Sequence, residues 1–132
     1  MAGDVSMNAV RHAVYTESCL GETVTAEITL YPNGIHAAVH GGSLPHIGAV
    51  SVIDAEGSVQ TIQYPGHKDA AISDRWARRL SELGYGAVVI TAGVHYDDLP
   101  RTDIQRVLQA TDRLLDRIQN ALRGSLNREP FI

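Results

Sequence analysis

Three short segments of this chain place histidine beside glycine, lysine or a carboxylate: Gly41–Gly48 (GGSLPHIG), His67–Asp69 (HKD) and Ala92–Asp97 (AGVHYD). Imidazole, ammonium and carboxylate groups bind phosphate, hold metal ions and move protons. Each segment is expected where a strand ends or a helix begins, and such ends gather at one edge of a sheet. We therefore predict that the three segments meet in a single polar pocket.

Phosphate is the first ligand that these residues fit. The glycine pair in Gly41–Ser43 can turn successive backbone N–H groups toward an anion, although such pairs are also common in ordinary turns. His67 and Lys68 precede a predicted helix, whose free N–H groups and dipole favour an anion. The alternative for this corner is a capped helix start with a solvated Lys68. Arg75, within two turns of the helix start, is predicted to swing toward the same phosphate.

Asp69 has two alternative roles at this corner. It is predicted to cap the first helix, and its carboxylate can instead hold His67. A metal ion is a further possibility, because His46, His67 and His95 together would supply three imidazole ligands and leave a position for water. Their spacing matches no recognised ligand signature, so we assign no metal ligand from the sequence.

The chain carries no signature of a dedicated catalyst. A Gly-x-Ser-x-Gly elbow, a Walker loop and a Gly-x-Gly-x-x-Gly turn are all missing from the printed sequence. No nucleophile or acid–base pair stands out, and Cys19 lies near a predicted turn with no histidine beside it. This composition favours a binding protein over an enzyme.

Alternating and helical periodicities predict the elements that position the three segments. Residues 23–31 alternate strictly between apolar and polar side chains, which indicates a half-buried strand, and Pro32-Asn33-Gly34 is a hairpin signal. Further strands are predicted at 10–16, 35–40, 47–53, 58–64 and 86–94, of which 47–53 is apolar on both faces and suits a central strand.

Two amphipathic helices complete the predicted fold. One begins near Asp69 and ends at Gly84, and the other begins at a capping box, Thr102–Gln105, and ends at Gly124. The order of strands first, then helix, strand and helix, predicts an α+β domain. We expect a mostly antiparallel sheet with both helices packed on one face.

Size and composition limit the remaining possibilities. The chain of 132 residues is one domain's worth, with residues 1–8 and 125–132 expected to be frayed. A formal charge of -4 argues against a nucleic-acid partner. No signal peptide and no apolar run of the ~20 residues that span a bilayer is recognised. Lone Cys19 suits a reducing cytoplasm, and exposed sheet edges favour a homo-oligomer.

The three motifs, in this order, resemble those of the prenylated-flavin chaperone family: Gly41-Gly42-x-x-Pro45-His46-Ile47-Gly48-x-Val50, His67-Lys68-Asp69 and Ala92-Gly93-x-His95-x-Asp97. The resemblance covers roughly residues 24–122 and is specific in its combination of motifs. Members of this family are the small accessory "D" proteins encoded beside non-oxidative decarboxylases of hydroxyarylic acids such as gallate, vanillate or 4-hydroxybenzoate.

The resemblance implies a non-catalytic protein that holds prenylated flavin mononucleotide (prenylated FMN) or hands it to the decarboxylase. A separate flavin prenyltransferase makes that cofactor and is a second implied partner. Tyr64 and Tyr96, beside the motifs, are candidates to stack on the flavin ring. A structural subunit of the decarboxylase complex and a small metal-dependent enzyme remain alternatives. The predicted cofactor contacts are Gly41, Gly42, Ser43, His46, Ile47, Gly48, His67, Lys68, Asp69, Arg75 and His95.

Overall fold

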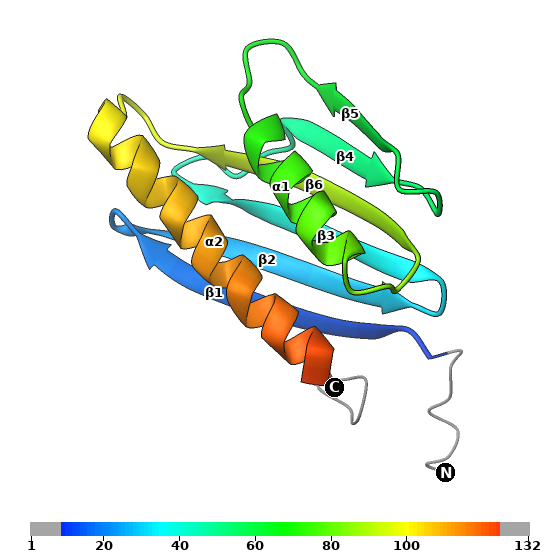
Figure 1. The fold of residues 1–132 in the computed structure, drawn as a ribbon. Coiled ribbons are helices and arrows are strands. Elements are labelled where there is room, and N and C mark those ends of the chain that lie inside the picture. The colour runs from blue at the N-terminus through cyan, green and yellow to red at the C-terminus, as the bar shows by residue number, and fades with distance from the viewer. Residues whose placement is uncertain (1–8, 125–132) are drawn as a thin grey trace.

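A computed structural model describes residues 9–124, and the two ends predicted to fray, 1–8 and 125–132, lie outside the described residues. Within residues 9–124 the chain forms a six-stranded sheet and two helices (Figure 1). The strands are β1 (Arg11–Cys19), β2 (Glu22–Tyr31), β3 (Gly34–Gly42), β4 (Ala49–Ile53), β5 (Val59–Gln63) and β6 (Ala87–His95), and the helices are α1 (Ala70–Ser81) and α2 (Arg101–Gly124).

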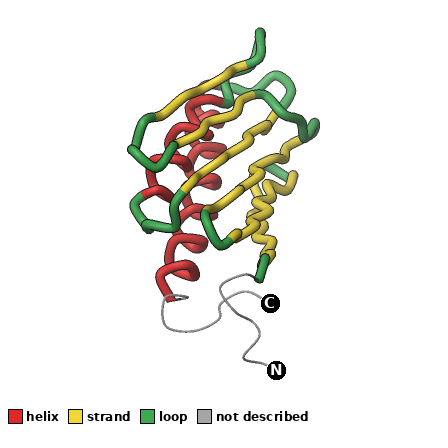
Figure 2. The backbone as a smooth tube through the Cα atoms, turned by 90° about the vertical axis from the view of Figure 1, so that its right-hand side faces the viewer, coloured by secondary structure: helices red, strands yellow, loops and turns green. Residues whose placement is uncertain are grey.

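The strands lie in the order β1-β2-β3-β6-β4-β5. Neighbouring strands are antiparallel at every junction except the parallel pair β3 and β6. Figure 2 shows both helices on one face of this sheet. The α+β class with a mostly antiparallel sheet and two helices on one face is therefore confirmed. Neither helix of the described residues is long and apolar enough to cross a membrane.

The core lies between the sheet and the two helices. The alternation predicted for residues 23–31 is confirmed, because every second side chain of β2 is buried. Helix α1 contributes Trp76 and Leu80, which are fully buried. Strands β3 and β6 and the inner face of α2 complete the core with Ala37, Val39, Val88, Ile90, Ala92, Leu114, Leu115, Ile118 and Leu122.

The opposite face of the sheet carries no helix from residues 9–124 (Figure 2). Strand β4 has neighbours on both sides, as predicted for a central strand. Only one of its faces is covered, however, and its side chain Val52 is exposed together with Ile62 on β5. An apolar strand that pairs with a neighbouring strand on each side therefore does not need both of its faces to be buried.

Helix α2 begins one residue before the predicted capping box. The Pro100 carbonyl accepts hydrogen bonds from the N–H groups of Asp103 and Ile104, at 2.9 and 3.1 Å. Thr102 lies inside the helix and is exposed, so its assignment as the N-cap is wrong. The Pro100 carbonyl thus accepts the first hydrogen bonds of the helix, which begins at Arg101.

The connection from β3 to β4 brings the motifs together. Because β6 lies between these two strands, the loop of residues 43–48 has to cross the end of β6. Backbone hydrogen bonds fasten the crossing, from His46 N–H to Gly93 O at 3.3 Å and from Gly48 N–H to Ala92 O at 2.8 Å. A Cβ atom at Gly93 would overlap the His46 carbonyl, so the crossing requires glycine there.

Candidate functional site

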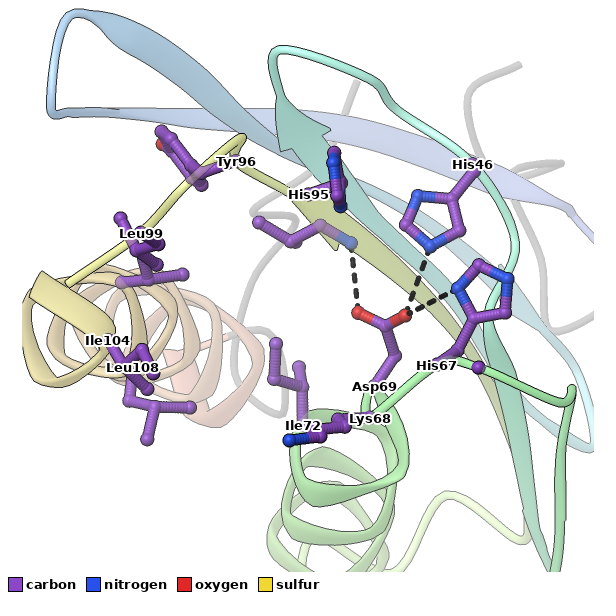
Figure 3. A pocket seen from close by; sticks show the side chains of 13 residues that line it. His46, His67, Lys68, Asp69, Ile72, His95, Tyr96, Leu99, Ile104 and Leu108 are labelled. Carbon is purple, nitrogen blue, oxygen red and sulfur yellow. Dashed lines mark hydrogen bonds and ion pairs between the residues drawn. The ribbon is translucent and has the colours of Figure 1, made fainter. Parts of the chain in front are cut away.

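A pocket of about 280 Å³ lies between the first turns of α1 and α2, at the sheet edge where β3 and β6 end (Figure 3). Its polar end is lined by His46, His67, Lys68, Asp69 and His95. The remaining lining is mostly apolar and comes largely from the segment after β6 and the first turns of α2: Ile72, Val94, Tyr96, Leu99, Ile104, Val107 and Leu108. Residues from all three motifs thus share one pocket, as predicted.

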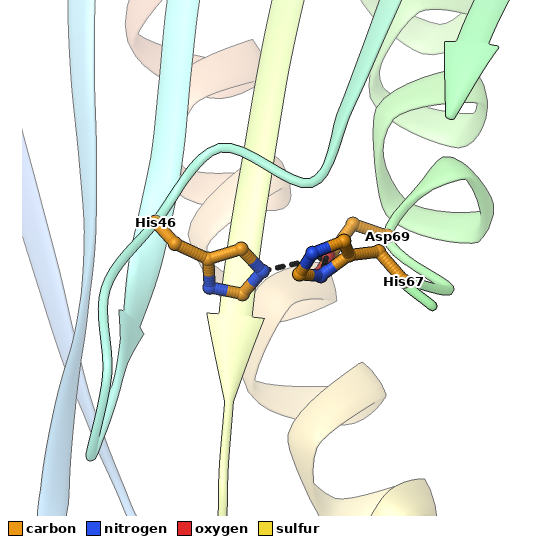
Figure 4. Close-up of side chains that lie close together, drawn as sticks. All are labelled: His46, His67 and Asp69. Carbon is orange, nitrogen blue, oxygen red and sulfur yellow. Dashed lines mark hydrogen bonds and ion pairs between the residues drawn. The ribbon is translucent and has the colours of Figure 1, made fainter. Parts of the chain in front are cut away.

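Asp69 lies at the centre of the polar end, and its side chain is only 7% exposed. One carboxylate oxygen, Oδ1, accepts a hydrogen bond from Val94 N–H at 3.0 Å. The other, Oδ2, lies 3.1 Å from His46 Nε2 and 3.9 Å from His67 Nδ1 (Figure 4). The carboxylate therefore connects the start of α1 to the end of β6 and to the crossing loop.

The predicted capping role of Asp69 is wrong. The residue stands at the N-cap position, but its side chain makes no cap hydrogen bond. Gln63 replaces it, since its Oε1 accepts the Ala70 N–H at 2.9 Å. The next N–H groups are also occupied, because Ile72 N–H donates to the Asp69 carbonyl at 3.0 Å. The free backbone donors predicted for an anion at this helix start are thus already bonded.

Gly48 provides the space in which the carboxylate lies. A Cβ atom at this position would overlap Asp69 Oδ2 and would lie 3.0 Å from His46 Nε2. Ile47, its neighbour, is 61% exposed and lies outside the pocket. Of the two residues predicted as contacts here, only the glycine borders the polar end.

The Gly41–Ser43 segment lies next to the backbone of His95 and does not line the pocket. Ser43 donates its backbone N–H to the His95 carbonyl at 2.8 Å, and its hydroxyl donates to the same oxygen at 3.3 Å. Gly42 has a φ of 81°, and a Cβ atom there would overlap that carbonyl. The segment therefore fixes the backbone of His95, and the N–H of Ser43 is not free to bind an anion.

The three histidines do not form one group. The ring centroids of His46 and His67 are 4.7 Å apart, with a tilt of 34°. The His95 ring is 6.3 Å from that of His46, and its Nε2 is bonded to Asp97 Oδ1 at 3.0 Å. Asp69 takes the third place instead, because the ligand atoms of His46, His67 and Asp69 all lie within 4.8 Å of one another.

The two nearest cations differ in their pairing. The Lys68 ammonium lines the pocket and has no ion-pair partner among residues 9–124. Arg75 is directed to α2, where its Nε and Nη2 bond both oxygens of Asp112 at 2.7 and 3.2 Å. The Asp112 carboxylate raises the pKa of Arg75. The structure thus places Lys68 at the pocket and Arg75 outside its lining.

Tyr96 is the aromatic side chain of the pocket. Its hydroxyl donates to the Cys19 carbonyl at 2.8 Å. Burial raises the pKa of Tyr96, and the nearby Cys19 side chain raises it further. Tyr64, the other stacking candidate, is exposed and lies outside the lining.

The apolar end was missed as part of the site by sequence reasoning. Ile104 and Leu108 lie on the apolar face of α2, yet Ile104 is 44% exposed and lines the pocket. A usable signal was the position of Ile104 in the first turn of its helix, next to the Ala92–Asp97 motif. Apolar side chains at a helix start are less completely covered than those of the middle turns.

Comparison with known proteins places these residues in a family. The sequence profile of the prenylated flavin chaperone LpdD-like domain matches residues 18–123. The chain is 31% identical over 107 residues to Protein LpdD of Lactiplantibacillus plantarum (strain ATCC BAA-793 / NCIMB 8826 / WCFS1), which covers 77% of this chain and 79% of that protein. The matched residues include all three motifs.

The fold also resembles that of a solved structure. A chain from the crystal structure of a novel chaperone complex for yeast 20S proteasome assembly superposes with a TM-score of 0.57. The match covers 86% of this chain and 98% of the other, at 16% sequence identity. At that identity the likeness concerns the fold alone.

Proposed function

The chain belongs to the prenylated flavin chaperone LpdD-like family, and on this premise we propose that it binds prenylated FMN and supplies it to a hydroxyarylic-acid decarboxylase. The observation that carries the proposal is the two-ended pocket, with imidazoles and an ammonium at one end and aliphatic side chains at the other. A flavin nucleotide with an added prenyl group has the same division between a charged phosphate and an apolar ring system.

The chemistry of the lining fits this cofactor. Lys68 has no carboxylate partner within the described chain and can form a charge-assisted hydrogen bond to a phosphate oxygen. His46, His67 and His95 offer further polar contacts at the same end, while Leu99 and its neighbours would contact the ring and the prenyl group. In this role the cofactor is cargo, and its chemistry belongs to the acceptor enzyme.

The size of the pocket suits a carrier. About 280 Å³ is slightly below the ~300–1,000 Å³ of typical enclosed ligand sites. We therefore propose that part of the cofactor stays outside the pocket, where a decarboxylase can take it over. A fully enclosing site would instead slow release.

Binding measurements with three flavins test the proposal. We expect prenylated FMN to bind more tightly than FMN, because it adds apolar surface, and FMN to bind more tightly than riboflavin, which lacks the phosphate. Fluorescence or calorimetric titration under anaerobic conditions measures each affinity. Failure to bind any of the three, together with full decarboxylase activation in the absence of the chain, would refute the proposal.

Further expectations concern partners and location. We propose transient contact with the decarboxylase and with the flavin prenyltransferase, in the cytoplasm, where lone Cys19 stays reduced. Stable co-migration with the decarboxylase would instead favour a structural subunit. Self-association of this chain stays a prediction, which sedimentation velocity tests directly.

A further inference from the structure

We propose that His46, His67 and Asp69 bind one divalent transition-metal ion, with Zn²⁺ as the ion that suits these ligands. Two imidazole nitrogens and one carboxylate oxygen are typical protein ligands of zinc, and sites with three protein ligands keep further positions open. All three ligand atoms lie within 4.8 Å of one another, at the polar end of the pocket. The three-histidine site considered from the sequence would have used His95, whereas the structure places Asp69 beside His46 and His67.

The hydrogen bonds of His46 determine which of its nitrogens is available to a metal. Its Nδ1 lies 2.9 Å from the Leu44 carbonyl oxygen, which only accepts, so Nδ1 carries the proton. In the neutral ring Nε2 then presents a lone pair to Asp69 Oδ2, which also only accepts, at 3.1 Å. Two acceptors at this distance repel each other, and a cation between them removes the repulsion.

The surrounding groups orient both ligands as in known metal sites. Metal-binding histidines usually donate the other ring N–H to a backbone carbonyl or a carboxylate, which is the role of Leu44 O here. Asp69 is held in the same way, because Val94 N–H occupies Oδ1 and leaves Oδ2 for the ion. Gly48 keeps the space next to Oδ2 free of a side chain.

His67 completes the set with little movement. Ligands of a tetrahedral zinc ion, bound at ~2.0–2.2 Å, lie about 3.3–3.5 Å apart. The separation of His46 Nε2 and Asp69 Oδ2 is 3.1 Å, and that of His67 Nδ1 and Oδ2 is 3.9 Å. The His67 side chain is 38% exposed, so its ring can rotate toward the ion without disturbing the core.

Burial of the carboxylate strengthens the case for an ion. Asp69 is 7% exposed, and a buried charge requires a compensating partner. If phosphate binds at this end, as proposed above, the same ion would separate it from the carboxylate. That consequence rests on the proposed function, whereas binding of the ion itself does not.

Metal titration of the untagged, chelator-treated protein tests the inference without any flavin. We expect one equivalent of Co²⁺ to bind with visible ligand-field absorption, and Zn²⁺ to displace it. His67→Ala and Asp69→Asn should each weaken Zn²⁺ binding by about 100-fold or more. Removal of a group that only supports a ligand already weakens metal binding by about 10- to 100-fold, and removal of a ligand itself should cost at least as much. The matched control is His95→Ala, which lies in the same pocket outside the cluster and should leave the affinity unchanged.

Thermal unfolding separates loss of the site from loss of the fold. Zn²⁺ should raise the melting temperature of the wild-type chain but not that of the His67→Ala chain, because a ligand stabilises only the state that binds it. His67 is partly exposed, so the His67→Ala chain should fold normally without metal. Absence of stoichiometric metal binding to the wild-type chain, or equal affinity in the wild-type and His67→Ala chains, would overturn the inference.

Discussion

Two aspartates, one at the N-cap of helix α1 and one within it, connect this helix to the sheet, and the groups around them differ. Asp74 Oδ1 accepts hydrogen bonds from the hydroxyls of Ser51 on β4 and Thr61 on β5, at 2.5 and 2.6 Å. Asp69, at the helix start, faces imidazole nitrogens of His46 and His67. The first carboxylate is surrounded by hydroxyls, whose hydrogens rotate freely, and the second by rings with fixed nitrogens.

Proton positions explain why this difference matters. Ser51 donates to Asp74, so it accepts from the Ser73 hydroxyl at 2.6 Å, and each of these hydroxyls donates once. The Asp74 cluster is therefore satisfied by its own protons. At Asp69, the Nδ1 proton of His46 is directed to the Leu44 carbonyl, so a neutral His46 has no second proton for the carboxylate. The two sites show how the same residue type serves the fold in one place and a proposed ligand site in another.

The largest effect on stability is expected at Asp74. Removal of the carboxylate by Asp74→Ala takes away the charged acceptor shared by the Ser51 and Thr61 hydroxyls, and a hydrogen bond to a charged group contributes about 1.5–3 kcal/mol. We expect the free energy of unfolding to fall by about 2–3 kcal/mol, while binding of metal and flavin is unchanged. Urea denaturation measures the loss, with exposed Asp97→Ala as the control. An unaltered unfolding midpoint for Asp74→Ala would contradict the structural role given to Asp74.

Substitution of Lys68 tests the proposed ligand-binding role of the Asp69 end of the helix. A charge-assisted contact to phosphate contributes about 1.5–3 kcal/mol, so Lys68→Ala should weaken FMN binding by roughly ten- to a hundredfold. Riboflavin binding should change far less. Arg75→Ala, in the helix that follows Lys68, is the matched control, because its guanidinium is bonded to Asp112 and should not contribute. Equal losses for FMN and riboflavin in Lys68→Ala would place the phosphate elsewhere.

Conversion of each aspartate to asparagine should have opposite effects on the two clusters. In Asp69→Asn, Oδ1 still accepts from Val94, and the new amide can donate to His46 Nε2. The metal-free variant should therefore be as stable as the wild type or up to about 1 kcal/mol more stable at mildly alkaline pH. Asp74→Asn keeps an acceptor but loses the charge, which should cost about 1 kcal/mol. A loss of stability in Asp69→Asn would contradict the proton positions inferred for His46.

Periodic patterns predicted the sheet well because they depend on local sequence. The alternation in β2 defines its buried face without knowledge of any partner strand. The motifs were correctly expected at one edge, since parallel β3 and β6 end there together with the start of α1.

The errors arose where a distant residue determines the partner of a side chain. Asp69 satisfies the local rule for a cap, but His46, 23 positions away, reaches it only after the loop has crossed β6. Arg75 was predicted to reach a phosphate, and its partner Asp112 is 37 positions away on α2. No local pattern contains these contacts, because they depend on how two elements pack.

A third carboxylate, Glu17 on β1, should produce the smallest effect. Arg113 and Arg117 of α2 donate to its two oxygens at 2.9 and 3.2 Å, and these donors, led by the hydrogen bond from Arg113, lower the pKa of Glu17. Guanidinium only donates and carboxylate only accepts, so this cluster is complete without a further ion, as at Asp74. The pair lies near the surface, where such contacts contribute about 0.2–1 kcal/mol.

A lowered pKa in the folded state determines the direction of the pH dependence of Glu17. The contribution is fully present above the ordinary glutamate pKa of about 4.5 and is lost as the pH falls through the lower value of the folded chain. Glu17→Gln should therefore be less stable than the wild type near neutral pH by about 0.2–1 kcal/mol, and the two should converge in acid. Urea denaturation across this range measures the difference, and zinc affinity at neutral pH should be identical in both. Loss of zinc binding in the Glu17→Gln chain would show that the zinc site is not confined to His46, His67 and Asp69.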